Sequence, residues 1–180
     1  MGGPYRTILV DPPWPMEWER SKNMSYPTMS LKEISNLPIP DLADRDCQLW
    51  VWTTQGYLHK TFHLIEGWGF TYRQTVVWDK KMMGLGAWLR GQVEFLLLAT
   101  RGDVRTAAFG PRGQEGSAWT DVIREERREH SRKPGAAYAL VEALGEGPRL
   151  EMFARDRRAG WDCWGNQLSP TVQSLLPGGG

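Results

Sequence analysis

Residues 5–14 read YRTILVDPPW, and no other stretch of the chain indicates the fold so directly. Its first six residues form a short, largely apolar segment rich in β-branched side chains, and this segment stops at Asp11 and two prolines. Proline has no backbone N–H to donate to a neighbouring strand, so we interpret residues 5–10 as a buried strand that ends before Asp11. The motif that follows is therefore expected directly beyond the carboxyl end of a strand.

The remainder of the chain alternates between strand patterns and helix patterns. Apolar residues at helical spacing predict helices over residues 57–66 and 134–144, and Ser30 with Glu33 forms a capping-box pattern that begins a short helix. This alternation predicts a single α/β domain with a mainly parallel sheet flanked by helices. Near-continuous apolar strands further predict that both faces of the sheet are covered. The additional strands are expected at residues 48–53, 71–78, 93–100 and 149–154.

The composition of the 180-residue chain is that of one globular domain, which we place at residues 1–168, followed by a flexible tail at 169–180. No segment approaches the roughly 20 apolar residues that cross a bilayer, and we see no signal-peptide pattern, so we expect no membrane association. Cys47 and Cys163 lack metal-ligand spacing and are too few for a disulfide framework. We therefore expect no metal site and a cytoplasmic location.

Basic residues gather in three segments, each of which follows a strand-like stretch. The net charge of +1 is low for a protein that binds duplex nucleic acid through many phosphates. These clusters therefore either lie on solvated loops and helix faces or converge on one face of the domain. Their members are Arg101, Arg105 and Arg112; Arg124, Arg127, Arg128, Arg132 and Lys133; and Arg155, Arg157 and Arg158.

The motif Asp11-Pro12-Pro13-Trp14 combines two acceptor groups with an aromatic ring at a strand end, where ligands bind in open α/β sheets. The Asp11 carboxylate and the Pro12 carbonyl can each accept one hydrogen of an exocyclic amine, which draws that nitrogen toward the tetrahedral geometry of a nucleophile. The consecutive prolines fix the backbone that carries this carbonyl, and Trp14 offers a face on which a base can stack. These groups suit an amine on a flat base. The alternative is a turn that merely ends a strand.

Further segments, in the same order along the chain, resemble the adenine-N6 methyltransferase family typified by the catalytic subunit of the eukaryotic mRNA methyltransferase. Compact bacterial and phage members are the most similar. The resemblance implies a Rossmann-like methyltransferase domain that uses S-adenosylmethionine, in permuted order, with the catalytic motif N-terminal and much of the cofactor site C-terminal. The segments that carry it are residues 5–14, 26–30, 49–53, 76–80, 93–95, 130–134, 150–155 and 160–166.

The resemblance implies a cofactor site made by residues far apart in the sequence. Asp11 matches the positive charge of the cofactor, and Lys133 corresponds to a lysine near its carboxylate. Arg155 and Asn166 correspond to residues on the ribose, and Gln167 to a neighbour on the adenosine side. From the residues alone, Lys133 could instead be helix-start surface, Asn166 a turn residue and Gln167 exposed polar surface.

The resemblance also implies a substrate side. Asp11, Pro12, Pro13 and Trp14 would be the catalytic residues that hold the target amine and base. Tyr26, Trp52 and Trp78 would line the pocket, and Glu94 would lie on its substrate side. Because the chain has ten tryptophans and large aromatics dominate buried area, core packing is the alternative for Trp52 and Trp78; Tyr26 could be a loop anchor.

We therefore expect an adenine-N6 methyltransferase acting on nucleic acid, with DNA preferred because of the compact chain. RNA is the first alternative, since the motif contacts only the base and the 2′-hydroxyl is read elsewhere. The second is a catalytically silent subunit that binds nucleic acid beside an active partner, although the intact motif disfavours it. A homodimer or a hetero-partner would add a second set of basic loops. A dinucleotide-binding dehydrogenase is excluded, because the first strand has no Gly-x-Gly-x-x-Gly after it.

Overall fold

The computed structural model describes residues 3–15, 27–84, 88–104, 119–127 and 132–165. The predicted tail at 169–180 lies outside these ranges. Within them, no helix is long and apolar enough to cross a membrane. The elements in chain order are β1 (Tyr5–Val10), α1 (Leu31–Ser35), α2 (Ile39–Leu42), β2 (Ala43–Thr53), α3 (Leu58–Gly67), β3 (Thr71–Asp79), β4 (Val93–Arg101), β5 (Val122–Arg124), α4 (Gly135–Leu144), β6 (Arg149–Met152) and β7 (Asp162–Trp164).

The strands form one sheet in the order β5-β3-β4-β2-β1-β6-β7. Adjacent strands of this sheet run parallel, except that β4 is antiparallel to both β2 and β3. The predicted mainly parallel sheet is therefore confirmed, with β4 as its exception. The strands β1, β2, β3 and β6 all end at the same side of the sheet, which we call the carboxyl edge, and β4 begins there.

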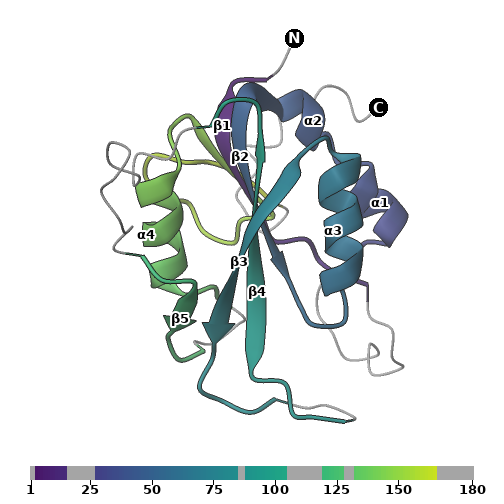
Figure 1. Cartoon of the computed structure of the whole chain (residues 1–180), viewed down its shortest axis with the longest axis vertical. Coiled ribbons are helices and arrows are strands. Elements are labelled where there is room, and N and C mark those ends of the chain that lie inside the picture. Colours follow the sequence, from purple (N-terminus) through teal and green to yellow (C-terminus); the bar gives the residue numbers. More distant parts are fainter. Residues whose placement is uncertain (1–2, 16–26, 85–87, 105–118, 128–131, 166–180) are drawn as a thin grey trace.

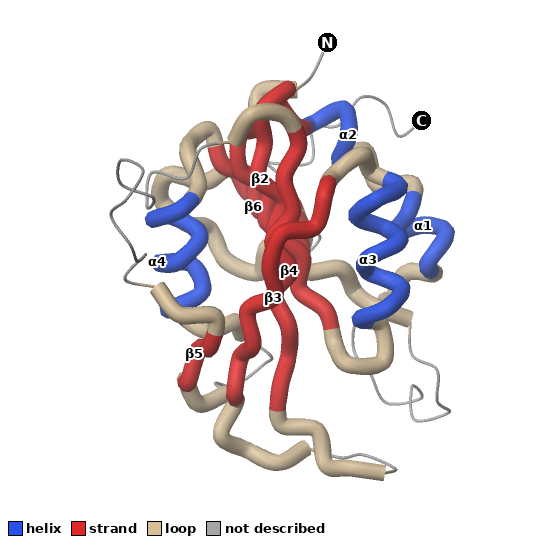
Figure 2. The backbone as a smooth tube through the Cα atoms, viewed as in Figure 1, coloured by secondary structure: helices blue, strands red, loops and turns tan. Residues whose placement is uncertain are grey.

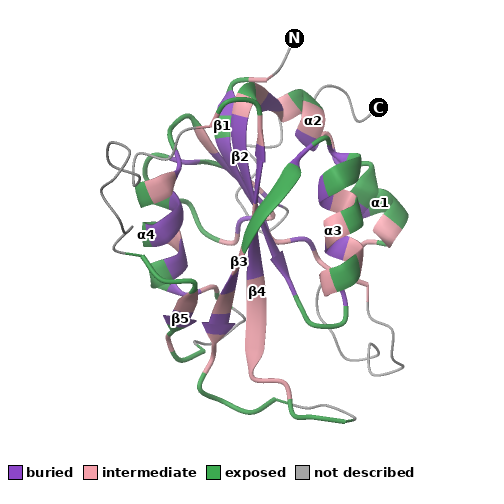
Figure 3. Cartoon of the chain, in the orientation of Figure 1, coloured by how far each residue is buried: buried purple, intermediate pink, exposed green. Residues whose placement is uncertain are grey.

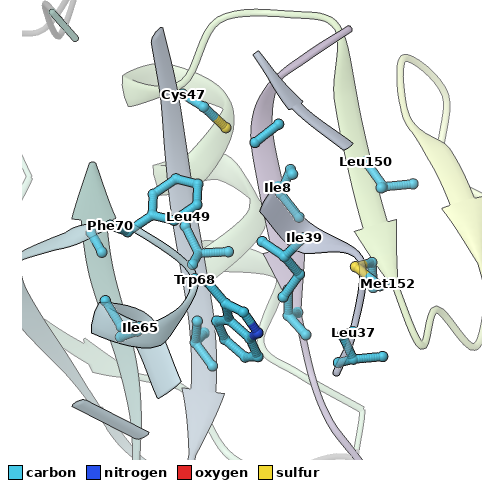
Figure 4. Close-up of a cluster of buried hydrophobic side chains, with 14 of the residues drawn as sticks. Ile8, Leu37, Ile39, Cys47, Leu49, Ile65, Trp68, Phe70, Leu150 and Met152 are labelled. Atoms are coloured by element: carbon cyan, nitrogen blue, oxygen red, sulfur yellow. The ribbon is translucent and has the colours of Figure 1, made fainter. Parts of the chain in front are cut away.

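Helices cover both faces of this sheet, as predicted. Figure 1 shows α1 and α3 on one side of the strands and α4 on the other, and Figure 2 shows the strands as a single central layer. Successive residues of a strand point to opposite faces. Accordingly, Ile8 and Leu49 pack in the core beneath α1 and α3 (Figure 4), whereas Leu9 and Trp50 pack in the core beneath α4.

The predicted strands and helices are all present; most bounds differ by two residues or fewer, but β2 begins at Ala43, five residues before its predicted start. Ser30 caps α1, because its hydroxyl accepts from the Glu33 backbone N–H at 3.2 Å while the Glu33 carboxylate accepts from the Ser30 N–H at 2.7 Å. This confirms the capping box. The elements that the sequence did not predict are short: α2 has 4 residues, and β5 and β7 have 3 each.

One member of the first basic cluster has a structural role. Arg101 ends β4, and because β4 runs against its neighbours, this residue lies at the side of the sheet opposite the carboxyl edge. Its guanidinium donates to the carbonyls of Pro40, Ala43 and Asp44 at 2.5 to 3.2 Å. Arg101 thus fixes the junction of α2 and β2 and does not join the other basic clusters.

Candidate active site

The Asp-Pro-Pro-Trp motif leaves the end of β1 as a fixed turn. The backbone N–H of Asp11 donates to the Met152 carbonyl of β6 at 3.4 Å, and the Trp14 N–H donates back to the Pro12 carbonyl at 2.9 Å. A carbonyl oxygen has two lone pairs, so the Pro12 oxygen retains capacity for one more donor. The Pro13 carbonyl accepts from the N–H of Met29 at 2.9 Å, which ties the turn to the segment before α1.

Trp14 is held by two contacts. Its indole N–H donates to the Trp52 carbonyl at 3.2 Å, and its ring stacks on Tyr57, with the ring centroids 5.1 Å apart and the planes at 17°. The Tyr57 hydroxyl donates in turn to the Pro15 carbonyl at 2.5 Å. Sequence reasoning missed Tyr57, because a tyrosine at the start of a helix carries no distinctive pattern. It fixes the orientation of the motif's aromatic ring.

A chain of alternating charges connects three strands and the start of α4 at the carboxyl edge. The Lys133 ammonium lies 3.1 Å from the Asp11 carboxylate and 2.9 Å from the Glu94 carboxylate. The other oxygen of Glu94 accepts from Lys80 at 3.2 Å. Glu94 reaches this position because the antiparallel β4 begins at the carboxyl edge. The structure thus brings together Asp11, Lys133 and Glu94, which the resemblance had assigned separately to the cofactor and substrate sides.

This network keeps its charges in spite of burial. Burial by itself would lower the pKa of Lys133, but the charges of Asp11 and Glu94 outweigh it and raise that pKa. Likewise, burial would raise the pKa of Glu94, but the Lys133 and Lys80 charges outweigh it and hold that pKa below its ordinary value. The Lys133 ammonium also lies 5.0 Å from the centre of the Trp52 ring, within the range of a cation–π contact.

A pocket of about 140 Å³ opens beside Asp11, between the end of β6 and the start of α4. Charged side chains of both signs surround it, which suits a ligand that carries both charges better than an apolar one. Phe153, at the end of β6, has a positive φ of 64°, a strained value for an aromatic residue and one that often marks a functional site. The lining residues are Asp11, Arg132, Lys133, Gly135, Tyr138, Glu151, Phe153, Arg155, Asp156, Arg157 and Arg158.

Glu151 and Tyr138 form a buried polar pair in the wall of this pocket. The Tyr138 hydroxyl donates to the Glu151 carboxylate at 2.7 Å, and the Arg158 guanidinium lies 3.7 Å from the centre of the Tyr138 ring. Burial is the main cause that raises the pKa of Glu151. Sequence reasoning gave Glu151 no role, although a glutamate between Leu150 and Met152 in an apolar strand was a usable signal.

Trp52 and Trp78 lie in the core, each with 1% of its surface exposed. Their rings meet edge to face at 6.0 Å, and the Trp78 indole N–H donates to the Glu125 carbonyl at 2.7 Å. The buried indole nitrogen of Trp52 has no hydrogen-bond partner among the described residues. These surroundings are those of core residues, and a role in the substrate pocket stays a prediction for both. Tyr26, Asn166 and Gln167 lie outside the described residues.

The layered sheet, the acceptor motif at a strand end and the charged pocket together define an α/β domain with a ligand site at the carboxyl edge. The MT-A70 family matches residues 5–167. The chain therefore belongs to the MT-A70 family, the adenine-N6 methyltransferase family that its motifs resemble.

Individual relatives agree with this membership. The chain is 30% identical to the type II methyltransferase M.MunI of a Mycoplasma species, over 91% of this chain and 78% of that protein. It is 30% identical to the putative N(6)-adenosine-methyltransferase MT-A70-like of Medicago truncatula, over 93% of this chain but 27% of the relative. It is 29% identical to the human N(6)-adenosine-methyltransferase catalytic subunit METTL3, over 92% of this chain and 28% of the relative. The chain thus spans about a quarter of the length of these two eukaryotic relatives.

Proposed function

We propose that this chain transfers the methyl group of S-adenosylmethionine to the N6 amine of adenine in DNA. The observation that carries the proposal is the position of Asp11, which lies at the carboxyl end of β1, lines the charged pocket and is 3.1 Å from the Lys133 ammonium. We prefer DNA to RNA because the chain covers 78% of a type II methyltransferase but about a quarter of its N(6)-adenosine-methyltransferase relatives. We still expect the protein to be located in the cytoplasm.

The pocket residues fit the groups of S-adenosylmethionine. The buried Lys133 ammonium would meet the cofactor's carboxylate, and the acidic side chains of Asp11 and Glu151 would meet its cationic groups. Arg155, which lines the pocket, would bind the ribose, with Asn166 and Gln167 completing the adenosine side. When bound, the cofactor supplies a methyl group on a positively charged sulfur.

This assignment makes the domain a Rossmann-like methyltransferase in permuted order. The catalytic motif follows β1, and residues 132–158, which line most of the pocket, come late in the chain. In an open parallel sheet, both sets of residues reach the same edge whatever their order in the sequence. The permutation therefore leaves the chemistry of the site unchanged.

On the substrate side, the Asp11 carboxylate and the Pro12 carbonyl would accept the two hydrogens of N6. This makes the nitrogen lone pair available, and once N6 has gained the methyl group its surplus proton passes to Asp11. Trp14 would stack on adenine through the ring face opposite Tyr57. Glu94 would hold Lys133 in place, Tyr26 would line the substrate side, and Trp52 and Trp78 would support the motif from the core.

The test is labelled-methyl transfer by the Asp11→Ala and Asp11→Asn variants. We expect each to lower the rate by about a hundredfold or more, because one of two preorganised acceptors is weakened or lost. Substrates are matched single-stranded DNA, duplex DNA and RNA, followed by digestion to nucleosides. Asp41→Ala, which changes an exposed aspartate in α2, is the matched control, and thermal melting verifies that all variants fold.

Near-normal transfer by Asp11→Ala would contradict the mechanism. Methyl groups on cytosine would contradict adenine as the target, and transfer to RNA in preference to DNA would move the substrate to the first alternative. A wild-type protein that folds yet methylates no nucleic acid would favour the silent subunit.

A further inference from the structure

The connection between β3 and β4 exposes large apolar side chains in a small part of the molecule. Met82 and Met83 are about 60% exposed, and Trp88 and Leu89 are 98% and 83% exposed. Figure 3 shows this connection as an exposed extension beyond the sheet. Single exposed apolar residues are ordinary, but several together mark an interaction surface. We call residues 80–84 and 88–92 the β3–β4 hairpin.

Hydrogen bonds give this hairpin a defined shape at the carboxyl edge. The Lys80 N–H donates to the Gln92 carbonyl at 3.1 Å, and the Gly84 N–H donates to the Gly91 carbonyl at 2.7 Å. The Arg90 side chain donates to the Gly84 carbonyl at 3.0 Å. A Cβ at Gly84 would lie 2.9 Å from the Gly91 oxygen, so the two sides approach too closely for a side chain. The apolar residues are thus presented by a paired backbone.

The charge of the hairpin indicates what kind of partner it meets. Between Lys80 and Gln92 the sequence has three cations, Lys80, Lys81 and Arg90, and no acidic residue. Lys80 is engaged by Glu94, while Lys81 and Arg90 are exposed. Cations beside exposed aromatic and aliphatic side chains complement an anionic partner that also offers flat apolar faces. Nucleic acid has both properties. A symmetric contact between two copies of the hairpin would instead bring like charges together.

The hairpin is joined directly to the candidate active site. Lys80, at its root, donates to the Glu94 carboxylate, which also binds Lys133 beside Asp11. A base can reach Asp11 only after it has left a duplex stack, and proteins that open duplexes often fill the gap with an apolar side chain. The hairpin carries such side chains at the edge where the target base would enter.

We propose that the β3–β4 hairpin is a wedge for duplex DNA: Trp88 and Leu89 enter the stack beside the target adenine, and Lys81 and Arg90 lie on the flanking phosphates. The proposal rests on the proposed function, because it takes Asp11 as the place to which the adenine is delivered. Met82 and Met83, on the other arm of the hairpin, add further exposed apolar area.

The experiment compares the full chain with the double variant Trp88→Ala, Leu89→Ala. Tyr72→Ala is the control, because it removes an exposed aromatic ring from the other end of β3. Three quantities are measured: binding of a fluorescent duplex DNA pool by anisotropy, kcat/KM for methyl transfer to duplex and single-stranded pools, and molar mass by light scattering. We expect duplex binding and duplex kcat/KM to fall roughly tenfold, the loss expected when an aromatic stack on a base is removed.

Single-stranded kcat/KM should change by less than about twofold in the same variant, since no stack has to be opened. Equal losses on both substrates, or an unchanged duplex value, would overturn the wedge. So would conversion of a dimer into a monomer with duplex binding intact, which would assign the hairpin to a second copy. If the wild type methylates no adenine but its duplex binding still depends on Trp88 and Leu89, the methyltransferase proposal fails and the DNA contact stands.

Discussion

Lys133 shows how one residue can serve both the stability of the domain and its chemistry. Its side chain is 13% exposed and lies between two carboxylates, those of Asp11 and Glu94. Burying charges is costly unless they are paired, and removal of one partner leaves the rest uncompensated. With Lys80 on the other oxygen of Glu94, the two cations and two anions of the network balance, and Lys133 is the cation that the carboxylate of the proposed cofactor would meet.

The variant Glu94→Gln tests this network through its pH dependence. Because the folded-state pKa of Glu94 is lowered, its contribution to stability is present above pH 4.5 and is lost as pH falls through the folded-state pKa. We expect the variant to be less stable than the wild type by about 3 kcal/mol at pH 7, and the difference to shrink in acid below pH 4.5. Urea unfolding at pH 7 and in acid measures both values.

A matched substitution at an exposed glutamate is the control for that measurement. Glu66→Gln changes a carboxylate whose side chain is 73% exposed, and it should alter stability by less than about 0.5 kcal/mol. A Glu94→Gln variant with the same loss at all pH values would contradict the charge argument.

At the scale of elements, the sequence predicted the type of each long helix and strand, because hydrophobic periodicity and caps are local signals. It did not predict the direction of β4, since an apolar run such as Leu96 to Ala99 is equally suited to either direction in a covered sheet. That direction decides the position of Glu94 and Arg101, at opposite sides of the sheet. The short strands β5 and β7 contain too few residues to show a period.

Of the candidate site, the motif and Lys133 were predictable, whereas Tyr57 and Tyr138 depend on tertiary contacts.

The junction of α2 and β2 depends on Arg101. Arg101→Met removes the donor to three backbone carbonyls, so we expect a loss of stability of about 2–3 kcal/mol. Arg101→Lys should recover part of it, because one ammonium cannot bond all three carbonyls. Unfolding in urea measures the loss, and Arg45→Met, at an arginine whose side chain is 87% exposed, is the control at the same side of the sheet. Methyl transfer per folded molecule should be unaffected, and a specific loss of activity in Arg101→Met would contradict a purely structural role.

At the scale of the whole molecule, the small net charge hides an uneven distribution. Arg132, Lys133, Arg155, Arg157 and Arg158 surround the pocket at the carboxyl edge, and the β3–β4 hairpin adds Lys81 and Arg90 at that edge. Members of the second and third basic clusters therefore lie together at this edge, which agrees in part with the interpretation that the clusters converge on one face. Arg101, of the first cluster, lies at the opposite side of the sheet. Among the described residues, we therefore expect the carboxyl edge to be the side that meets the proposed DNA.

Reversal of one charge at each edge tests this distribution. Arg157→Glu should weaken duplex DNA binding and make the salt slope of log K shallower by about one to two, because a phosphate contact is lost and a repulsive charge added. Arg45→Glu, on the opposite side of the sheet, should leave both unchanged. Anisotropy titrations at several salt concentrations measure the slopes, and equal effects of the two variants would show that no edge is preferred.

The single antiparallel strand has a consequence for how such a domain can change over evolution. Because β4 returns beside β3, the two are joined by a hairpin, and a hairpin can vary in length and sequence without any change in β1, which leads into Asp11, or in the segment before α4 that carries Lys133. A parallel strand in the same position would need a crossover of a dozen residues or more across one face of the sheet. The proposed catalytic motif thus stays at the end of a parallel strand, and the hairpin beside it is a replaceable module in which substrate preference can diverge.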